Sequence, residues 1–588
     1  MLKSVLKGLA ARRASRTPVT LQGAQALLDS GRTDEALAAL SALCTAEPDA
    51  FEPRLTLGRV LYATNALGPA LAALGHAHEL DPGDNDARYL LARAHIDCGD
   101  FDEAVVLLRP VAAALPDWAP GWLALGDAYT GARTLDDAED AYLRALALVP
   151  ESGIAHYNYG VALEKTGRID EAIEHYRRAL SIEPGFRRAH SNLLFALNRT
   201  DAITPEALYR EHLEWARRHA EPLTAAAPLA SSRKRVRRLR VGYVSADFRE
   251  HPIGYFCGPV LRHHTRGAFE VYCYSDVRAP DALTQSLREL DCVWRDTAAL
   301  VRRDGIDILV DLTGHTGGDR LLAFARRPAP LQVAWIGYPN TTGMSAMTHR
   351  ITDAYADPPG ATEHLHTERL VRMPEIYLPF AVPREDVPPG DAPALARGHV
   401  TFGSFNVAPK LTPRMLGVWA RILRELPGSR LMILTLPEGR ARSRVEKIFE
   451  RGGVDPARLD LRGTLTHRAF LEAHHGVDIA LDCYPYHGTT TTAHTLWMGV
   501  PLITLAGTTH ASRVGVSMLS NVGLPELVAS SEDDYTRIAV ELARDAPRLQ
   551  ALHENLRGRM LGSPNMDGAR FTRFLEEAYR AIWNEAAG

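Results

Sequence analysis

The stretch GWLALGDAYTGARTLDDAEDAYLRALALVP, from Gly121 to Pro150, contains two amphipathic helical segments that are joined by a turn and followed by a proline. The same pattern returns every 34 residues through the first third of the chain. Three positions keep this period: a proline at the end of each unit, an alanine, and a small residue where two helices would touch. The prolines fall at 48, 82, 116, 150 and 184, and the alanines at 36, 70, 104, 138 and 172. The small residues fall at 58, 92, 126 and 160.

Composition alone would not keep three separate positions in phase, so the pattern predicts helical repeats of the tetratricopeptide type. Such units bury their apolar faces only against their neighbours, and the array forms a curved solenoid with a concave wall. We expect this superhelix over residues 19–222. Asn158 and Asn192, on the first helices of their units, could clamp the backbone amides of a protein acceptor in the groove. The alternative is that both bond within or between helices.

Composition and charge exclude several classes of protein. The net charge of −4 offers no overall attraction to nucleic acid or to an anionic membrane. No run approaches the roughly 20 apolar residues of a membrane span. The basic segment 1–18 lacks the apolar region of a secretory signal. Six scattered cysteines show no metal-binding spacing, so we expect free thiols in a cytoplasmic protein.

A second basic run, SSRKRVRRLR at 231–240, has no interleaved aromatic residue and leads into a strand. This favours a solvated linker over 223–237 rather than a nucleic-acid-binding arm. Beyond it, short apolar strands alternate with helical stretches. The strands are expected in two series, at 239–245, 269–275, 306–314 and 331–337, and at 400–406, 430–436, 478–485 and 501–507.

Near-continuous apolar strands separated by helices predict parallel sheets that are covered on both faces. The proline-rich and charged segment 383–399 would join two doubly wound, Rossmann-like lobes, 238–395 and 396–588. Ligands of such sheets bind beyond the carboxyl ends of the strands. The loops at these ends carry His251, Asp311 with His315, Asn406 with Lys410, and the threonine run 489–492.

The threonine run is the clearest candidate for a ligand site. Gly488 permits a close backbone approach, and Thr489, Thr490, Thr491 and Thr492 lead into a helix, whose first turn has unpaired N–H groups and a positive dipole end. Glycine, hydroxyls and a helix start together suit a diphosphate, although one of the threonines could merely cap the helix. Lys410, in the same lobe, could neutralise charge on a leaving diphosphate; a surface lysine is the alternative. No D-x-D motif follows residue 238, so no metal is expected.

The motifs LRVGYVSADFREHP, ILVDLTGHTGG, HRITDAYADPP, VTFGSFN, PYHGTTTT and LAGTTHASRVGVSML resemble the catalytic region of the O-GlcNAc transferase and SPINDLY group. The resemblance covers residues 238–588 and is closer to SPINDLY. It implies a two-lobed GT-B fold behind tetratricopeptide repeats. It also implies transfer of GlcNAc from UDP-GlcNAc, or of fucose from GDP-fucose, to serine or threonine hydroxyls of a protein, with inversion and without metal or other cofactor.

The resemblance assigns roles to residues that match the family motifs. Lys410 matches the lysine that stabilises the leaving diphosphate, Thr490 and Thr491 match the threonine pair at the diphosphate, and His251 matches the active-site histidine. Arg513 matches the arginine of the ASRV motif, and Leu465 and His467 lie near the nucleobase loop. The acceptor hydroxyl would lose its proton to a base near His251, Asp311 or His315. A buried structural role is the alternative for His315.

One departure from the family concerns His494, which stands where the family has an acidic residue. If that acid binds the donor ribose, donor affinity or donor choice has changed here. The same departure supports a rival hypothesis, in which the repeats form a scaffold and the transferase region is inactive. A two-lobed sugar-nucleotide epimerase or hydrolase is a third hypothesis, and the repeats count against it.

Overall fold

The computed structural model describes residues 20–228, 238–296 and 300–586, and the chain forms two compact units that divide after residue 158. As predicted, helical repeats come first and parallel sheets follow. The expected basic segment 1–18 and residues 229–237 of the expected linker lie outside the described residues. Residues 223–226 of that linker belong to a helix instead.

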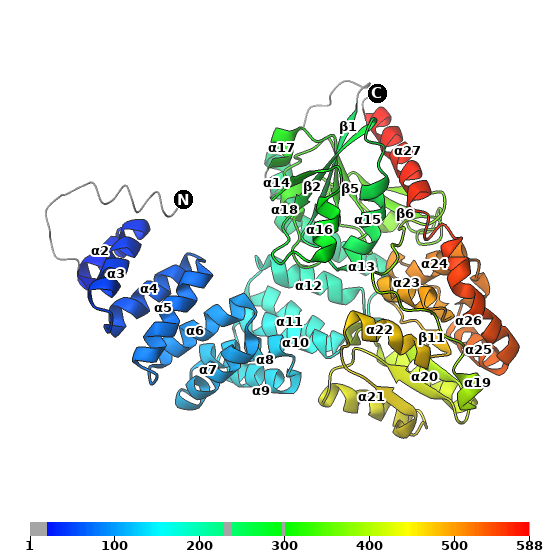
Figure 1. Cartoon of the computed structure of the whole chain (residues 1–588), viewed down its shortest axis with the longest axis horizontal. Helices are drawn as coiled ribbons and strands as arrows, with labels where there is room; N and C mark the ends of the chain where they lie inside the picture. The colour runs from blue at the N-terminus through cyan, green and yellow to red at the C-terminus, as the bar shows by residue number, and fades with distance from the viewer. Residues whose placement is uncertain (1–19, 229–237, 297–299, 587–588) are drawn as a thin grey trace. The chain divides into compact units, whose positions relative to one another are not determined.

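The first unit consists of helix pairs (Figure 1). Small residues let paired helices approach, as the period predicted. A Cβ atom added to Gly58 would lie 2.6 Å from the Leu74 side chain, and one added to Gly126 would lie 2.7 Å from the Tyr142 ring. The helices are α2 (Leu21–Asp29), α3 (Thr33–Ala46), α4 (Phe51–Ala63), α5 (Leu67–Leu80), α6 (Asn85–Cys98), α7 (Phe101–Ala114), α8 (Ala119–Ala132) and α9 (Leu135–Leu148).

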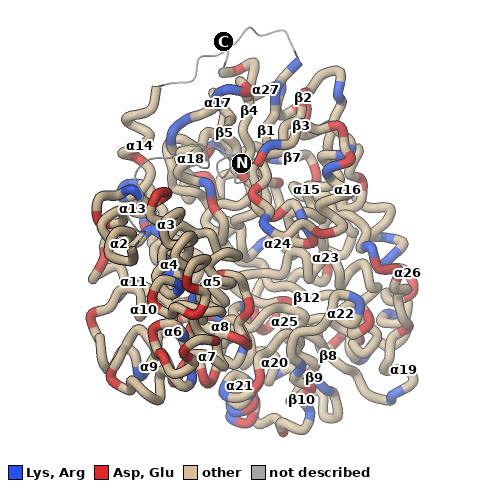
Figure 2. Tube along the Cα trace, turned by 60° about the vertical axis from the view of Figure 1, so that its left-hand side comes forward, with Lys and Arg blue, Asp and Glu red and all other residues tan. Residues whose placement is uncertain are grey.

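The first unit is strongly acidic, which the charge of the whole chain conceals. Residues 20–158 include 21 Asp or Glu against 8 Arg, with no Lys, and acidic positions are frequent along α4–α9 in Figure 2. The rest of the chain must therefore carry a net positive charge, since the total is only −4.

The second unit begins within α10 (Gly153–Lys165) and continues with helices before its first strand. Gly160 contacts Tyr176 as Gly126 contacts Tyr142, so the repeat continues here; an added Cβ would lie 2.7 Å from the Tyr176 ring. The helices are α11 (Ile169–Ile182), α12 (Arg187–Leu197), α13 (Pro205–Trp215), the π-helix η1 (Ala216–Ala220) and α14 (Glu221–Ala226).

The first lobe contains a seven-stranded parallel sheet in the order β3-β2-β1-β4-β5-β6-β7. One face packs on α15 (Pro252–His263), and the other packs on η1 and α18 (Leu321–Ala325). The remaining helices are α16 (Ala282–Arg288) and α17 (Val301–Asp304). The strands are β1 (Leu239–Ser245), β2 (Phe269–Ser275), β3 (Val293–Arg295), β4 (Ile308–Asp311), β5 (Leu331–Ala334), β6 (His349–Asp353) and β7 (Arg369–Met373).

The second lobe contains a six-stranded parallel sheet in the order β10-β9-β8-β11-β12-β13. Its strands are β8 (Thr401–Ser404), β9 (Arg430–Ile433), β10 (Leu459–Leu461), β11 (Ile479–Leu481), β12 (Leu502–Leu505) and β13 (Val528–Ala529). The helices include α20 (Pro413–Glu425), α21 (Arg440–Arg451), α22 (His467–Ala473), α23 (Thr490–Trp497), α24 (Val514–Val522), α25 (Glu532–Arg544) and α26 (Ala546–Leu561).

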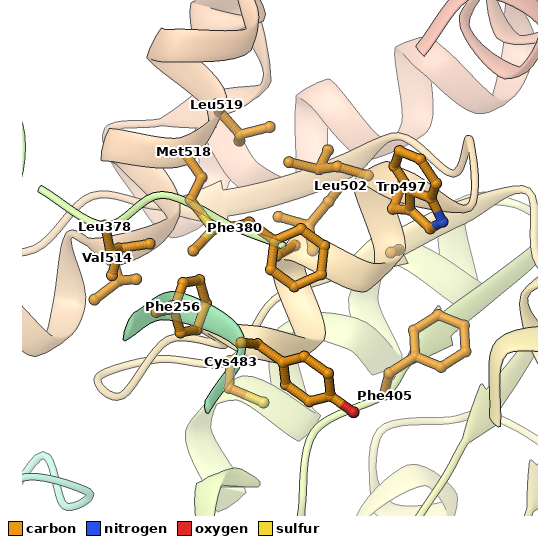
Figure 3. Packing of buried hydrophobic residues seen from close by; sticks show 14 of the residues in the cluster. Phe256, Leu378, Phe380, Phe405, Cys483, Trp497, Leu502, Val514, Met518 and Leu519 are labelled. Carbon is orange, nitrogen blue, oxygen red and sulfur yellow. The ribbon is translucent and has the colours of Figure 1, made fainter. Parts of the chain in front are cut away.

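The lobes share one continuous core. Figure 3 shows Phe256 and Leu378 of the first lobe beside Val514 and Met518 of the second. The C-terminal helix α27 (Gly568–Ala586) packs on α15 rather than ending the second lobe, although we expected that lobe to run to residue 588. Its apolar stripe explains this return, because Phe571 stacks on Trp335 of the first lobe with ring centroids 5.7 Å apart.

Candidate functional site

The loop after β11 is held by one buried carboxylate. Asp482 accepts hydrogen bonds from the backbone N–H groups of Cys483 and Gly488, each at 2.9 Å, and from the Thr504 hydroxyl at 2.9 Å. These bonds fold residues 483–488 back over the carboxyl end of the strand. Helix α23 therefore starts at this edge of the sheet, where ligands of parallel sheets bind.

The start of α23 leaves hydroxyl groups unpaired. Thr491 donates to the Asn406 side chain at 3.0 Å, but the Oγ1 atoms of Thr490 and Thr492 are buried without a hydrogen-bond partner among the described residues. A Cβ atom on Gly488 would lie 2.6 Å from the Thr492 hydroxyl, so only glycine leaves this space open. Buried polar groups are rarely left unpaired, and a helix N-terminus attracts anions. The geometry suits a phosphate group.

Lys410 lies beside this helix start. It ends the short 3-10 helix Ala408–Lys410, after β8, which neighbours β11 in the sheet. Its Nζ donates to the His487 carbonyl at 2.7 Å and lies 4.5 Å from the centre of the Tyr486 ring. Burial lowers the pKa of Lys410 to about 8. The sequence thus placed a lysine and a threonine run on loops that the structure brings together.

His251 caps α15 in the first lobe. Its Nδ1 accepts from the Ile253 N–H at 3.4 Å, and its side chain is 36% exposed. Burial lowers its pKa, and the Asp247 carboxylate, 3.8 Å away, acts in the opposite direction. Helix α15 faces the second lobe, because the ring of Tyr255 lies 5.7 Å from His494 and 6.1 Å from His467.

Asp311 and His315 are enclosed by the fold. Asp311 accepts from the backbone N–H groups of Thr313 at 3.1 Å and Gly314 at 2.8 Å, and burial raises its pKa to about 7. His315 hydrogen-bonds the Thr342 carbonyl through Nε2 at 3.0 Å and packs edge-on against Trp215. Burial lowers the pKa of His315 to about 3. These contacts fit the structural alternative for His315.

His494 lies in a cage of aromatic rings from both lobes. Tyr255, Phe380, His467 and Phe470 surround it with ring centroids 5.1–5.8 Å away. Burial lowers its pKa well below the ordinary value, and its Nε2 is unpaired within the part of the chain that the structure describes. The imidazole is therefore neutral near pH 7.

The other predicted donor residues make contacts within the protein. His467 hydrogen-bonds Glu385 at 2.7 Å through Nδ1, while its Nε2 is unpaired among residues 20–228, 238–296 and 300–586. Leu465 is half-buried and packs against the core. Arg513 donates to the carbonyls of Tyr355 at 2.7 Å and Gly507 at 3.0 Å, so it joins a loop of each lobe.

The two asparagines proposed for the acceptor fall in different units. Asn158, in the first unit, donates to Asp127 on α8 at 2.8 Å, which is the bonding between helices that the alternative anticipated. Burial raises the pKa of Asp127 to about 6. Asn192 lies on α12 of the second unit.

Sequence reasoning missed three residues of this region. Asp482 organises the loop, Tyr486 lies under Lys410, and Arg199, which follows α12, lies 5.6 Å from the Tyr486 ring. An acidic residue directly after an apolar strand was a usable signal for Asp482. Arg199 gave none, because it is far away in the sequence. Over the described ranges, no cluster of His, Cys, Asp or Glu could hold a metal ion, and no helix is long and apolar enough to cross a membrane.

Comparison with known proteins agrees with this architecture. The sequence model of Glycosyl transferase family 41 matches residues 218–380 and 391–575, and tetratricopeptide models match 21–84, 67–127 and 123–185. In solved structures, a lysine-to-methionine mutant of the Thermobaculum terrenum O-GlcNAc transferase superposes with a TM-score of 0.75 and 38% identity, covering 91% of this chain and 98% of its own. This confirms the predicted GT-B fold behind the repeats.

Curated relatives carry related names. The tomato (Solanum lycopersicum) "Probable UDP-N-acetylglucosamine--peptide N-acetylglucosaminyltransferase SPINDLY" is 43% identical over 395 residues, which are 65% of this chain and 42% of the relative. The Arabidopsis thaliana SEC protein, which is named with the same probable activity, is 32% identical over 371 residues, 59% of this chain and 37% of its own. The chain spans about two-fifths of the length of these relatives.

Proposed function

Since the chain belongs to glycosyl transferase family 41, we propose that it transfers a sugar from a nucleotide-diphosphate sugar to serine or threonine hydroxyls of a protein. The observation that carries this proposal is the arrangement at the start of α23. Two unpaired threonine hydroxyls, a helix N-terminus and Lys410 converge on one place. A diphosphate is the group that these donors and this cation would hold together.

In the proposed reaction, the acceptor hydroxyl attacks the anomeric carbon and the nucleoside diphosphate leaves from the opposite face, with inversion. Negative charge grows on the leaving oxygen, next to Lys410 and the dipole of α23. Preorganised positive charge of this kind lowers the barrier most where the new charge develops. The proposal needs no metal ion, so transfer should continue in excess EDTA.

We assign the base to His251 in preference to Asp311. A general base must reach the proton that it removes. His251 is 36% exposed at the start of α15, a helix that faces the second lobe, whereas Asp311 is 2% exposed and already accepts two backbone hydrogen bonds. Burial also keeps His251 neutral near pH 7, and only neutral imidazole can accept a proton.

The donor is UDP-GlcNAc or GDP-fucose. The activity named for the relatives supports UDP-GlcNAc, and the resemblance of the motifs to the O-GlcNAc transferase and SPINDLY group keeps GDP-fucose as the alternative. The acidic first unit supports acceptors with basic residues near the modified hydroxyl, because opposite charges attract across an interface. The repeats would bind such an acceptor in their groove.

Incubation of the full chain with each donor, and with serine- and threonine-rich peptides that do or do not carry flanking arginines, tests the proposal. We expect one N-acetylhexosamine or one deoxyhexose to appear in the intact mass of the peptide. A thermal-shift series with UDP, GDP and CMP should show stabilisation by the nucleotide of the true donor. No mass increase together with no stabilisation would support the scaffold hypothesis, which the departure at His494 favours.

A further inference from the structure

Arg199 follows α12 at the end of the helical repeats, and its side chain is buried. Its guanidinium group lies 3.8 Å from the centre of the Phe195 ring and 5.6 Å from that of Tyr486. Its Nη1 forms an ion pair with Glu164 of α10, and the Tyr176 hydroxyl of α11 donates to the same carboxylate at 2.9 Å. The cation is therefore fixed by residues of the last repeats.

Tyr486 connects this group to the second lobe. Arg199 lies near its ring, and the Lys410 ammonium lies 4.5 Å from the centre of the same ring. A ring that contacts two cations is favoured by cation–π attraction, but the two cations repel each other. The position of the ring therefore affects both the location and the acidity of Lys410.

A second contact joins the same elements. The turn between α10 and α11 touches the short helix that carries Lys410: a Cβ atom on Gly167 would lie 2.6 Å from the Ala408 carbonyl oxygen. Arg444 of the second lobe donates to the Thr166 carbonyl in this turn. The Lys410 segment is therefore packed against the repeats as well as against its own lobe.

We propose that Arg199 is a positioning residue for Lys410: held by Glu164, it fixes the ring of Tyr486 on which the Lys410 ammonium rests. The role of Lys410 in this statement rests on the proposed function. By this geometry the last repeats are part of the donor site, in addition to any binding of the acceptor. Arg199 acts through Tyr486 and touches no reacting atom.

The charges around Lys410 determine how its pKa depends on Arg199. Burial is the main cause of its lowered pKa; Cys483 and Asp482 raise it, and Arg199 lowers it further. Tyr486 offers its ring and His487 its carbonyl. Loss of the Arg199 cation should therefore raise the pKa of Lys410. A residue that only supported the fold would not change this value in a fixed direction.

The test variant is Arg199→Met, which keeps a long apolar stem and removes the cation. The pH dependence of acetic anhydride labelling at Lys410, followed by peptide mapping, gives the pKa of its amine without any turnover. We expect that pKa to rise by about half a pH unit or more. We also expect kcat to fall about tenfold, because a misplaced catalytic group costs rate.

Arg187→Met is the matched control. Arg187 lies on α12, the helix that Arg199 follows, and forms an ion pair with Asp319 of the first lobe at 2.8 Å, away from Tyr486. The Arg187→Met substitution should leave the pKa of Lys410 unchanged. An unchanged pKa in Arg199→Met, or an equal change in Arg187→Met, would overturn the proposal.

Misfolding of Arg199→Met and an inactive wild-type protein each call for a different measurement. If Arg199→Met does not fold, Glu164→Gln releases Arg199 without removing it, and kcat should fall with the peptide acceptor at saturation; an unchanged kcat would count against the proposal. If the wild-type protein transfers no sugar, the proposed function fails, while the labelling of Lys410 still decides whether Arg199 controls its acidity.

Discussion

Asp311, at the carboxyl end of a first-lobe strand, has both carboxylate oxygens bonded to the fold, whereas several polar side chains at the same edge of the second lobe keep an unpaired atom. Asp311 accepts two backbone hydrogen bonds, and His315 bonds a carbonyl through Nε2, while the buried Nδ1 of His315 has no partner among the described residues. Thr490, Thr492 and His494 each keep a buried, unpaired polar atom, as judged from the described parts of the chain. Since burying an unpaired polar group costs free energy, we expect a ligand to complete the bonding where such atoms gather at a helix start, as at Thr490 and Thr492. Residue type and loop position alone do not separate these two cases.

The largest effect is expected at Lys410. Lys410→Ala removes the only charge proposed to meet the leaving diphosphate, and kcat should fall about 1000-fold. Mass spectrometry of the peptide product measures this loss. The thermal transition should remain close to that of the wild type, because within the described residues the lysine ammonium donates a single hydrogen bond, to the His487 carbonyl. Turnover retained in a folded Lys410→Ala protein would remove Lys410 from the mechanism.

The pH profile of kcat/KM compares the candidate bases of the first lobe. His251 must be neutral to accept a proton, so the rate should rise with pH as the imidazole loses its proton. Because burial lowers the pKa of His251, this rise should fall below the ordinary imidazole value of 6.5. Lys410 must be protonated, so the rate should fall again near pH 8. His251→Asn keeps a capping side chain and should reduce kcat about 100-fold. A rising limb near pH 7 that disappears in Asp311→Asn would instead identify Asp311 as the base.

Part of this comparison was predictable from the sequence. The carboxyl-end rule brought Lys410 and the run at Gly488 to one edge, and the structure explains their contact because β8 and β11 are neighbours. Which threonine is paired was not predictable, since it depends on the direction of the Asn406 side chain. Strand β6 was missed because it is buried but polar, with Arg350 and Asp353 bonded inside the protein. Apolar periodicity cannot find such a strand.

Thr491 and Thr492, in the same helix turn, test whether an unpaired hydroxyl marks the ligand site, because only the Thr491 hydroxyl is paired within the fold. Thr492→Val replaces an unpaired hydroxyl with a methyl group of similar shape, so the free energy of unfolding should stay constant or rise. Affinity for the donor nucleotide should fall about tenfold, as for a lost hydrogen bond to a charged group. Thr491→Val removes the bond to Asn406 and should cost about 1 kcal/mol of stability. Calorimetry of unfolding and nucleotide titration measure both; equal stability losses would show that pairing does not distinguish the two threonines.

The smallest effect is expected at the aromatic cage around His494, where His494 and the nearby His474 differ in whether their ring nitrogens are paired. His474 stacks on Phe405 and uses both ring nitrogens, Nδ1 to the Phe470 carbonyl at 3.0 Å and Nε2 to the Thr495 hydroxyl at 3.2 Å. The Nε2 of His494 faces no partner in the residues that the structure covers. His474→Leu should therefore lower stability by about 1 kcal/mol and leave donor affinity unchanged.

His494→Leu should show the opposite pattern, because its imidazole nitrogen makes no hydrogen bond that the fold would lose. Donor affinity should fall about threefold, as for one neutral hydrogen bond, and the thermal transition should hold or rise. Titration with UDP and GDP also tests what the change from the family acid means. A loss confined to one nucleotide would make His494 a determinant of donor choice. Unchanged affinity for both nucleotides would place the ligand away from the cage. The unpaired nitrogen of His494 would then lower the stability of the fold without contributing to binding.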